Sequence, residues 1–119
     1  MVKEHEFMEG TLYLHFDDGL YLVLNPSKHD SGDILGVDKI SLYHNGNELF
    51  NLSNLDNINV SEIDQKRFLK YLRQGISYAN SKLNDYLNGR IKLNQWEEKY
   101  NELCIIMKEA EKSLTSRLT

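Results

Sequence analysis

The hydrophobic pattern of this chain changes near residue 60. Before that point apolar and polar residues alternate, which is typical of β-strands with one buried face. After it apolar residues recur every three or four positions, which is typical of amphipathic helices. The sequence therefore predicts a single α+β domain over residues 1–119, with a β half over about residues 1–57 and an α half over about residues 61–118.

The first hairpin is predicted from alternating leucines in residues 7–16 and 20–24. A three-residue loop over residues 17–19 pairs Leu14 with Leu22 and gives the hairpin one wholly apolar face. A two-residue loop would mix the two faces. The pattern therefore favours the longer loop, with its glycine in the left-handed conformation.

A second hairpin is predicted for residues 37–44 and 48–52. A three-residue loop over residues 45–47 aligns Leu42 with Phe50, whereas a two-residue Asn-Gly turn would shift this alignment by one residue. The apolar pairing favours the three-residue loop. Together the two hairpins predict an antiparallel four-stranded β-meander in the N-terminal half.

The connection between the hairpins, residues 25–36, is predicted to be a long irregular loop that contains the only proline of the chain. Its His29, Asp30 and Asp33 are residue types that bind divalent cations or act in acid–base chemistry. No second motif supplies further ligands, and aspartate is common in turns. The pattern therefore favours a turn, and no metal, cofactor or catalytic residue is predicted.

Two helices are predicted over about residues 62–88 and 95–117. Ser61 is placed as the N-cap of the first helix, and Asn88-Gly89 supplies its stop. The short link favours an antiparallel helical hairpin packed on one face of the sheet. The first helix has an apolar face wide enough to contact both the second helix and the sheet, and this width also suggests a homodimer through the helical hairpin.

Charge is distributed unevenly along the chain. Residues 1–60 have a formal net charge of −7, residues 61–92 of +4 and residues 93–119 of −1. The first predicted helix carries a basic set, Lys66, Arg67, Lys70 and Arg73. Such a set indicates contact with phosphates or an acidic partner, but it is more often a solvated helix face. It lacks interleaved aromatic residues, which weakens a single-strand stacking site.

A second candidate surface combines tyrosines with acidic residues. The residues predicted to bind a partner are Tyr13, Tyr21, Tyr43, Ile105, Asp17 and Asp18. Tyrosine is enriched at the centres of protein interfaces, and carboxylates steer association with a basic partner. The alternative is that the tyrosines reflect β propensity and the charges serve solubility.

The composition narrows the class of protein only partly. The single cysteine, Cys104, rules out an intramolecular disulfide, and its place in a helical pattern favours a packed thiol over a nucleophile. The first residues show no signal peptide, and no apolar run has membrane-spanning length, so a cytoplasmic protein without a membrane partner is predicted. No P-loop, dinucleotide, nucleophile-elbow or zinc motif occurs, so an enzyme is not expected.

These features predict a small non-enzymatic protein-binding module. Twelve asparagines and ten lysines suggest an AT-rich coding genome, and with it a bacterium or phage. An inhibitor, immunity or regulatory protein of this kind would act by occluding a larger protein partner with a basic surface. The alternative is a nucleic-acid-associated regulator that uses the basic face of the first helix.

Overall fold

The computed structural model describes residues 1–8, 11–28, 34–52, 61–91 and 100–118. Within these residues the β half contains five strands and a short 3₁₀ turn: β1 (Glu4–Met8), β2 (Thr11–His15), η1 (Asp17–Gly19), β3 (Leu20–Lys28), β4 (Ile34–His44) and β5 (Asn47–Leu52). The described α half contains α1 (Glu62–Leu87) and α2 (Tyr100–Leu118). The predicted α+β class is therefore confirmed.

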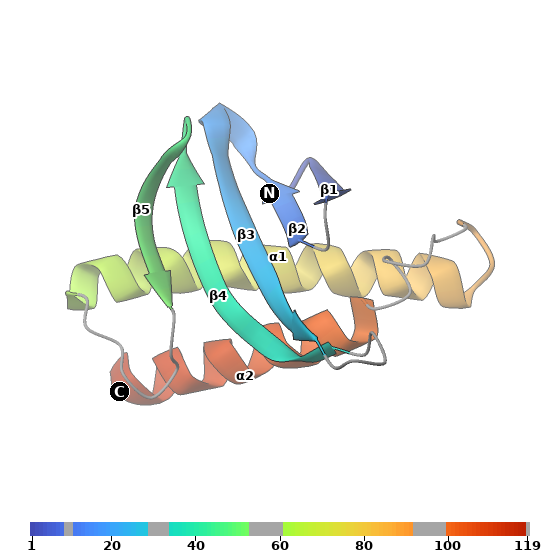
Figure 1. Cartoon of the computed structure of the whole chain (residues 1–119). Coiled ribbons are helices and arrows are strands. Elements are labelled where there is room, and N and C mark those ends of the chain that lie inside the picture. The colour runs from blue at the N-terminus through green and yellow to red at the C-terminus, as the bar shows by residue number, and fades with distance from the viewer. Residues whose placement is uncertain (9–10, 29–33, 53–60, 92–99, 119) are drawn as a thin grey trace.

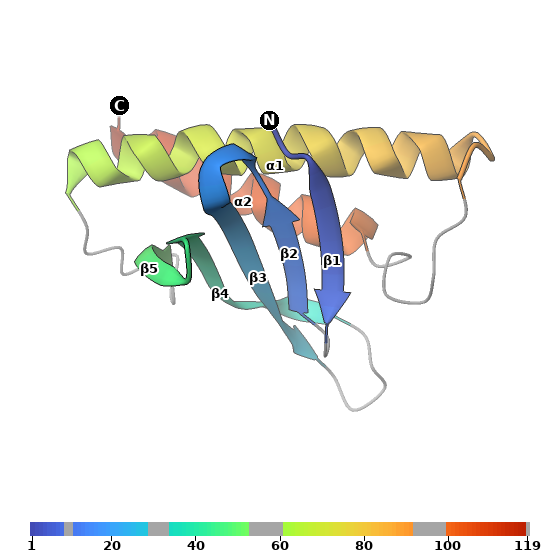
Figure 2. The same cartoon turned by 90° about the horizontal axis from the view of Figure 1, so that it is seen from above.

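The molecule has two layers, which are visible in Figures 1 and 2. One layer is an antiparallel sheet with the strand order β1-β2-β3-β4-β5. The other consists of α1 and α2, which run antiparallel, contact each other and lie on the same side of the sheet. The predicted arrangement of two antiparallel helices on one face of a sheet is confirmed. In the described part of the chain, the other face of the sheet has no helix over it.

The β2–β3 hairpin has the predicted register. Leu14 lies opposite Leu22 and Leu12 lies opposite Leu24, and all four side chains are fully buried. The connection is η1, whose last residue, Gly19, has a φ of 77°. The hydrophobic pattern determines this loop because a register shifted by one residue would turn the leucines toward solvent.

The sequence predicted a single strand over residues 7–16, and this prediction is wrong. Residues 7–8 end β1 and Thr11–His15 form β2, and in these two antiparallel strands His5 lies opposite Leu14. The hydrophobic pattern does not reveal β1 because its inward-facing His5 binds the Tyr78 hydroxyl of α1, at 2.8 Å, and is not an apolar core residue. The described sheet therefore has five strands where four were predicted.

The β4–β5 hairpin has the predicted apolar pairing but not the predicted loop. Leu42 lies opposite Phe50. The strands are joined by the two-residue turn Asn45-Gly46, whose φ values of 50° and 87° are typical of a type I′ turn. A bulge between the Leu42 and Tyr43 pairings absorbs the extra residue, so the turn signal and the apolar pairing are both satisfied.

Much of the predicted loop over residues 25–36 belongs to the sheet. β3 continues to Lys28 and β4 begins at Ile34, with register shifts on both sides of Pro26–Ser27. Bulges of this kind accommodate a proline, which has no N–H for the strand ladder. The candidate ligand set His29, Asp30 and Asp33 lies outside the described residues.

α1 begins and ends close to the predicted positions. Ser61 Oγ accepts a hydrogen bond from the backbone N–H of Asp64 at 3.2 Å, as an N-cap does. Asn88 is the C-cap, and Gly89 follows it with a φ of 71°. The predicted start of the second helix, residues 95–99, lies outside the described residues, and α2 is described from Tyr100.

The core lies between the sheet and the two helices. Its buried apolar residues are Leu12, Leu14, Phe16, Leu22, Leu24, Ile40, Leu42, Leu52, Phe68, Leu69, Leu72, Ile76, Ala79, Leu103, Cys104, Met107, Ala110 and Leu114. Gly75 allows α1 to approach the strands closely, because a Cβ atom there would lie 3.1 Å from Leu14 Cδ1. Cys104 is packed in this core as predicted, and desolvation raises the pKa of its thiol.

The wide apolar face of α1 packs against the sheet over only part of the length of the helix. Tyr71 packs edge-on against Phe16 with ring centroids 5.1 Å apart, and Tyr78 contacts His5. Near the C-terminal end of α1 the same face leaves the sheet, and Figure 1 shows this end projecting past the strands. Leu87 there is 69% exposed. A homodimer through the helices remains a hypothesis, because the contacts of Tyr71 and Tyr78 already explain much of the width.

Candidate functional site

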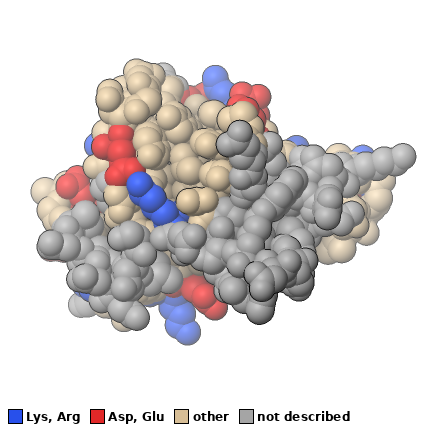
Figure 3. Space-filling model, viewed as in Figure 1, with Lys and Arg blue, Asp and Glu red and all other residues tan. Residues whose placement is uncertain are grey.

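We call the face of the sheet that points away from α1 and α2 the outer face. Cross-strand pairing arranges its side chains in rows. The first row is Glu4, His15, Tyr21, Tyr43 and Glu48, and the second is Glu6, Tyr13, Val23, Ser41 and Asn51. Figure 3 views the molecule from this side and shows an uncharged area with charged side chains near its edges.

The three tyrosines predicted to bind a partner lie together in the outer face. Tyr21 and Tyr43 stack with ring centroids 5.2 Å apart and an interplanar angle of 7°. Tyr13 and His15 flank Tyr21 with centroid distances of 6.4 and 5.6 Å. The hydroxyls of Tyr13 and Tyr21 have no hydrogen-bond partner among the described residues, so both are available to another molecule.

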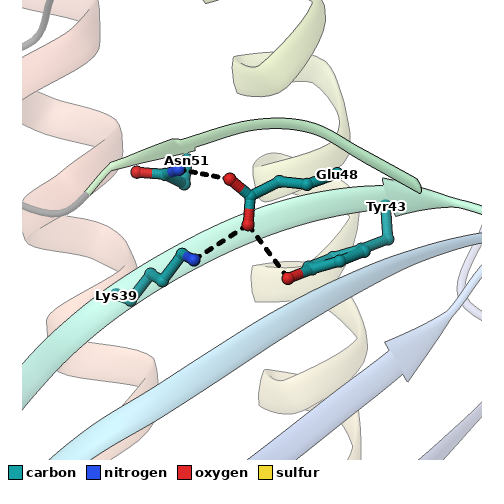
Figure 4. A network of polar contacts seen from close by, with 4 residues as sticks. All are labelled: Lys39, Tyr43, Glu48 and Asn51. Atoms are coloured by element: carbon teal, nitrogen blue, oxygen red, sulfur yellow. Dashed lines mark hydrogen bonds and ion pairs between the residues drawn. The ribbon is translucent and has the colours of Figure 1, made fainter. Parts of the chain in front are cut away.

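Glu48 connects the side chains on the β4–β5 side of the outer face, as Figure 4 shows. Its Oε2 accepts a hydrogen bond from the Tyr43 hydroxyl at 2.9 Å and lies 2.8 Å from Lys39 Nζ. Its Oε1 accepts a hydrogen bond from the Asn51 side-chain amide. The Tyr43 side chain therefore has two contacts: its ring stacks on Tyr21, and its hydroxyl donates a hydrogen bond to Glu48.

These contacts shift three pKa values away from neutrality. The hydrogen bond from Lys39 is the main cause that lowers the pKa of Glu48 below its ordinary value of 4.5. The hydrogen bond with Glu48 is the main cause that raises the pKa of Lys39 above 10.5 and that of Tyr43 above 10.0. A general acid or base requires a pKa moved toward the working pH, so these shifts are typical of a structural network.

The β1 side of the outer face is acidic. Glu6 Oε1 lies 2.8 Å from His15 Nε2, and Glu4 is the cross-strand neighbour of His15. Glu4 has no ion-pair partner within the described ranges. Beyond the end of β2, Asp17 pairs with Lys3 at 3.0 Å. The described residues therefore neutralise the negative charge on this side only in part.

The other residues predicted to bind a partner do not all join the tyrosines. Asp17 and Asp18 both lie in η1, directly after β2, so they are at the end of the outer face. Ile105 is 50% exposed, as expected from its helical position. It belongs to α2, however, and α2 lies on the opposite side of the sheet. A partner that covers the tyrosines on a flat surface does not reach Ile105.

The basic residues of the alternative nucleic-acid site are on the exposed side of α1: Lys66, Arg67, Lys70 and Arg73. Lys66 pairs with Glu62 at 3.3 Å, Arg73 Nε lies 3.8 Å from Glu111 Oε2 of α2, and Lys70 Nζ lies 5.6 Å from the ring centroid of Tyr71. Arg67 has no partner in the described residues. Exposed pairs of this kind are typical of a solvated helix face, so they weaken the nucleic-acid interpretation without testing it.

Two of the open hollows in the described part of the chain lie outside the outer face. One, of about 240 Å³, is lined by residues of the first two positions and of α1, including Gln74 and Tyr78. The other, of about 470 Å³, lies on the C-terminal part of α2. No group of three or more His, Cys, Asp or Glu side chains that could hold a metal ion occurs within the described ranges. No helix in those ranges is long and apolar enough to cross a membrane.

Sequence reasoning missed Lys39, Glu48 and Asn51 because it assigned a three-residue loop to the second hairpin. The two-residue Asn-Gly turn places Glu48 directly opposite Tyr43, which is what allows the hydrogen bond between them. The strand alternation already placed Lys39 and Tyr43 on one side of β4. The turn signal was therefore sufficient to pair Glu48 with Tyr43, whereas the position of Asn51 also depends on the bulge that follows.

Comparison of the chain with protein-family models, with curated proteins and with solved structures found no match. The choice between possible functions therefore depends on the geometry and charge of the outer face and of α1.

Proposed function

We propose that this chain is a small non-enzymatic protein-binding module that docks on a larger protein through the outer face of its sheet. The observation that supports this most strongly is the group of Tyr13, Tyr21 and Tyr43 on the face that no described helix covers. Tyrosine supplies a large contact area at low cost in conformational entropy, and it is enriched among the residues that dominate binding.

The side chains of the outer face are preorganised in the free chain. The stack of Tyr21 on Tyr43 and the three contacts of Glu48 hold these side chains in fixed positions. Side chains that are already ordered lose little further freedom on association, so more of the contact energy appears as affinity. A cluster of unconnected surface tyrosines would lack this advantage.

The size of the outer face indicates how a partner would have to bind. Five strands about 4.8 Å apart, with lengths of five to eleven residues at about 3.3 Å per residue, cover an area of roughly 600 Å². A standard interface buries about 800 Å² on each partner. A stable complex therefore requires the surrounding rim as well, including Asp17 and Asp18 in η1. We propose that the bound chain acts by blocking the surface of its partner, as an inhibitor, immunity or regulatory protein does.

The test is an affinity capture from lysate of the source cells with three baits: the natural chain, Tyr21→Thr/Tyr43→Thr and Ile105→Ser. Each capture is run with and without nuclease, and recovered proteins are quantified by mass spectrometry. We expect the natural chain and Ile105→Ser to recover the same protein, at near-equal amount to the bait and with or without nuclease. The tyrosine variant should lose most of it.

Threonine is chosen because it retains β propensity while it removes the ring. Circular dichroism of each bait controls for folding. Equal capture by all three baits would refute binding through the outer face. Recovery that is lost on nuclease treatment, and that both variants retain, would instead support the regulator that uses the basic side of α1.

A further inference from the structure

The acidic and the neutral halves of the outer face differ in how their charges are balanced. On the β4–β5 side the Lys39 ammonium lies 2.8 Å from the Glu48 carboxylate and offsets its charge. On the β1 side Glu6 contacts His15 at 2.8 Å, and Glu4 has no ion-pair partner in the described part of the chain. The unbalanced negative charge therefore lies directly beside Tyr13, which is opposite Glu6, and one strand further from Tyr21, which is opposite His15.

The tyrosines of α1 and those of the outer face also differ in whether a cationic side chain of the chain lies over the ring. On α1 the Lys70 ammonium lies 5.6 Å from the ring centroid of Tyr71, and the Lys82 ammonium lies 5.5 Å from that of Tyr78. In the described part of the chain, no lysine or arginine is placed in this way over Tyr13 or Tyr21. No cation of the described residues therefore competes at these rings with a cation supplied by another molecule, although one face of the Tyr21 ring is covered by Tyr43.

We infer that the partner of the outer face is a basic protein segment that places an arginine side chain over Tyr13 and Tyr21, with its charge directed toward Glu6 and Glu4. This inference rests on the proposed function, because it names the chemistry of the partner at the same surface. A guanidinium is planar, stacks on aromatic rings and binds carboxylates with two parallel hydrogen bonds. The outer face offers rings and carboxylates side by side, and an arginine uses both at once.

Other partner chemistries fit this surface less well. An acidic segment would be repelled by Glu4 and Glu6, since opposing like charges reduce affinity by a large factor. A wholly apolar segment would bury the carboxylates without a counter-charge, which is unfavourable. A lysine fits the charge, but as a compact ammonium it lacks the planar contact with the rings.

The experiment is selection from a displayed library of random 12-residue peptides on the immobilised full chain. Peptides that also bind Tyr13→Thr/Tyr21→Thr are removed by counter-selection. The remaining peptides are synthesised, and their dissociation constants are measured at low and at high salt against the natural chain, Glu4→Gln/Glu6→Gln and Glu62→Gln/Glu109→Gln. The last variant is the matched control, because it removes the same charge from α1 and α2.

We expect arginine to be enriched in the selected peptides. Glu4→Gln/Glu6→Gln should weaken their binding about tenfold, and 0.5 M salt should weaken it by a similar factor, because both remove the attraction between the guanidinium and the carboxylates. Replacing the conserved arginine of a selected peptide with glutamine should have the same effect. The control variant should bind within about twofold of the natural chain, since its changes lie far from the outer face.

Two other results would overturn the inference and are distinguishable from each other. Peptides that depend on the tyrosines but lack cations, and that are insensitive to the glutamate changes, would leave the proposed function standing and exclude the arginine. A selection that yields no tyrosine-dependent peptide would count against both the arginine and the use of the outer face as a peptide-binding surface. The glutamate changes are conservative, and only Glu6 is half-buried while the others are exposed, so circular dichroism of each variant suffices to exclude misfolding.

Discussion

The inner and outer faces of the sheet are formed by alternate residues of the same strands, yet they differ in chemistry. Leu22 points to α1 and α2 and is fully buried, whereas its neighbour Tyr21 points the other way and stacks on Tyr43. The inner face is required for folding, because it supplies about half of the core. The outer face carries stacked aromatic rings and a connected polar network, and no described helix covers them. The contrast supports the proposal that the outer face contacts another molecule.

The largest effect is expected on the inner face. Leu22→Ala should reduce the free energy of unfolding by about 3 kcal/mol, because it removes buried methyl groups and leaves a cavity against α1. Urea unfolding followed by circular dichroism measures this. Leu22→Met, which keeps most of the volume, is the control and should cost about 1 kcal/mol. If Leu22→Ala and Tyr21→Thr had equal costs, the distinction between a folding face and a binding face would fail.

The next effect concerns the turns that fix the register of both faces. Gly19 has a φ of 77°, and a Cβ atom there would lie 2.1 Å from Asn45 Oδ1 of the neighbouring turn. Gly19→Ala should therefore cost about 2 kcal/mol in unfolding free energy. Gly46→Ala is the control, because its φ of 87° imposes the same strain but no atom lies within 4 Å. It should cost about 1 kcal/mol, and a cost equal to that of Gly19→Ala would show that the contact between the turns is unimportant.

On the outer face the effect on stability should be smaller. Tyr21→Thr should reduce the free energy of unfolding by about 1 kcal/mol, which is the usual size of cross-strand aromatic contacts. The same urea titration measures it. A loss as large as 3 kcal/mol would mean that the tyrosine stack is primarily a folding element, and it would remove the main support for the proposed binding surface.

The smallest effect is expected from Glu48→Gln, and it should depend on pH. The lowered pKa of Glu48 means that its contribution is present above about 4.5 and is lost as the pH falls through the value in the folded chain. The raised pKa values of Lys39 and Tyr43 mean that their contributions are present below about 10 and are lost as the pH rises further.

Thermal unfolding of the natural chain and of Glu48→Gln across pH measures this dependence. The difference in melting temperature should be largest between about pH 5 and pH 10 and should shrink on both sides. Glu109→Gln on α2 is the matched control and should show no such window. A difference that stays constant across pH would contradict a stabilising role for the charge of Glu48.

The sequence predicts the inner face much better than the outer face. Inward-facing leucines allow only one register, so the pairing of Leu14 with Leu22 could be derived from spacing alone. β1 could not, because an edge strand with an inward-facing histidine lacks the apolar alternation. The tyrosines could be selected by residue type. Their grouping, and the separation of Ile105 from them, depended on which side of the sheet the helices cover.

The Glu48 network could not be predicted from hydrophobic spacing. Polar side chains tolerate several registers, so their contacts are determined by the turn and the bulge between them. Once the Asn45-Gly46 turn is assigned, Glu48 lies opposite Tyr43 and the network follows. Turn chemistry thus carries information about surfaces that hydrophobic spacing does not.

The claim that the outer face is the binding surface is best tested by hydroxyl-radical footprinting of the chain, alone and in the complex recovered by affinity capture. Tyr86 on α1, which is 37% exposed, serves as the internal reference. We expect the labelling of Tyr13, Tyr21 and Tyr43 to fall strongly on binding while that of Tyr86 and Ile105 stays unchanged. Unchanged labelling of the three tyrosines, with protection of Tyr86 or Ile105, would contradict the claim and place the partner on the helices.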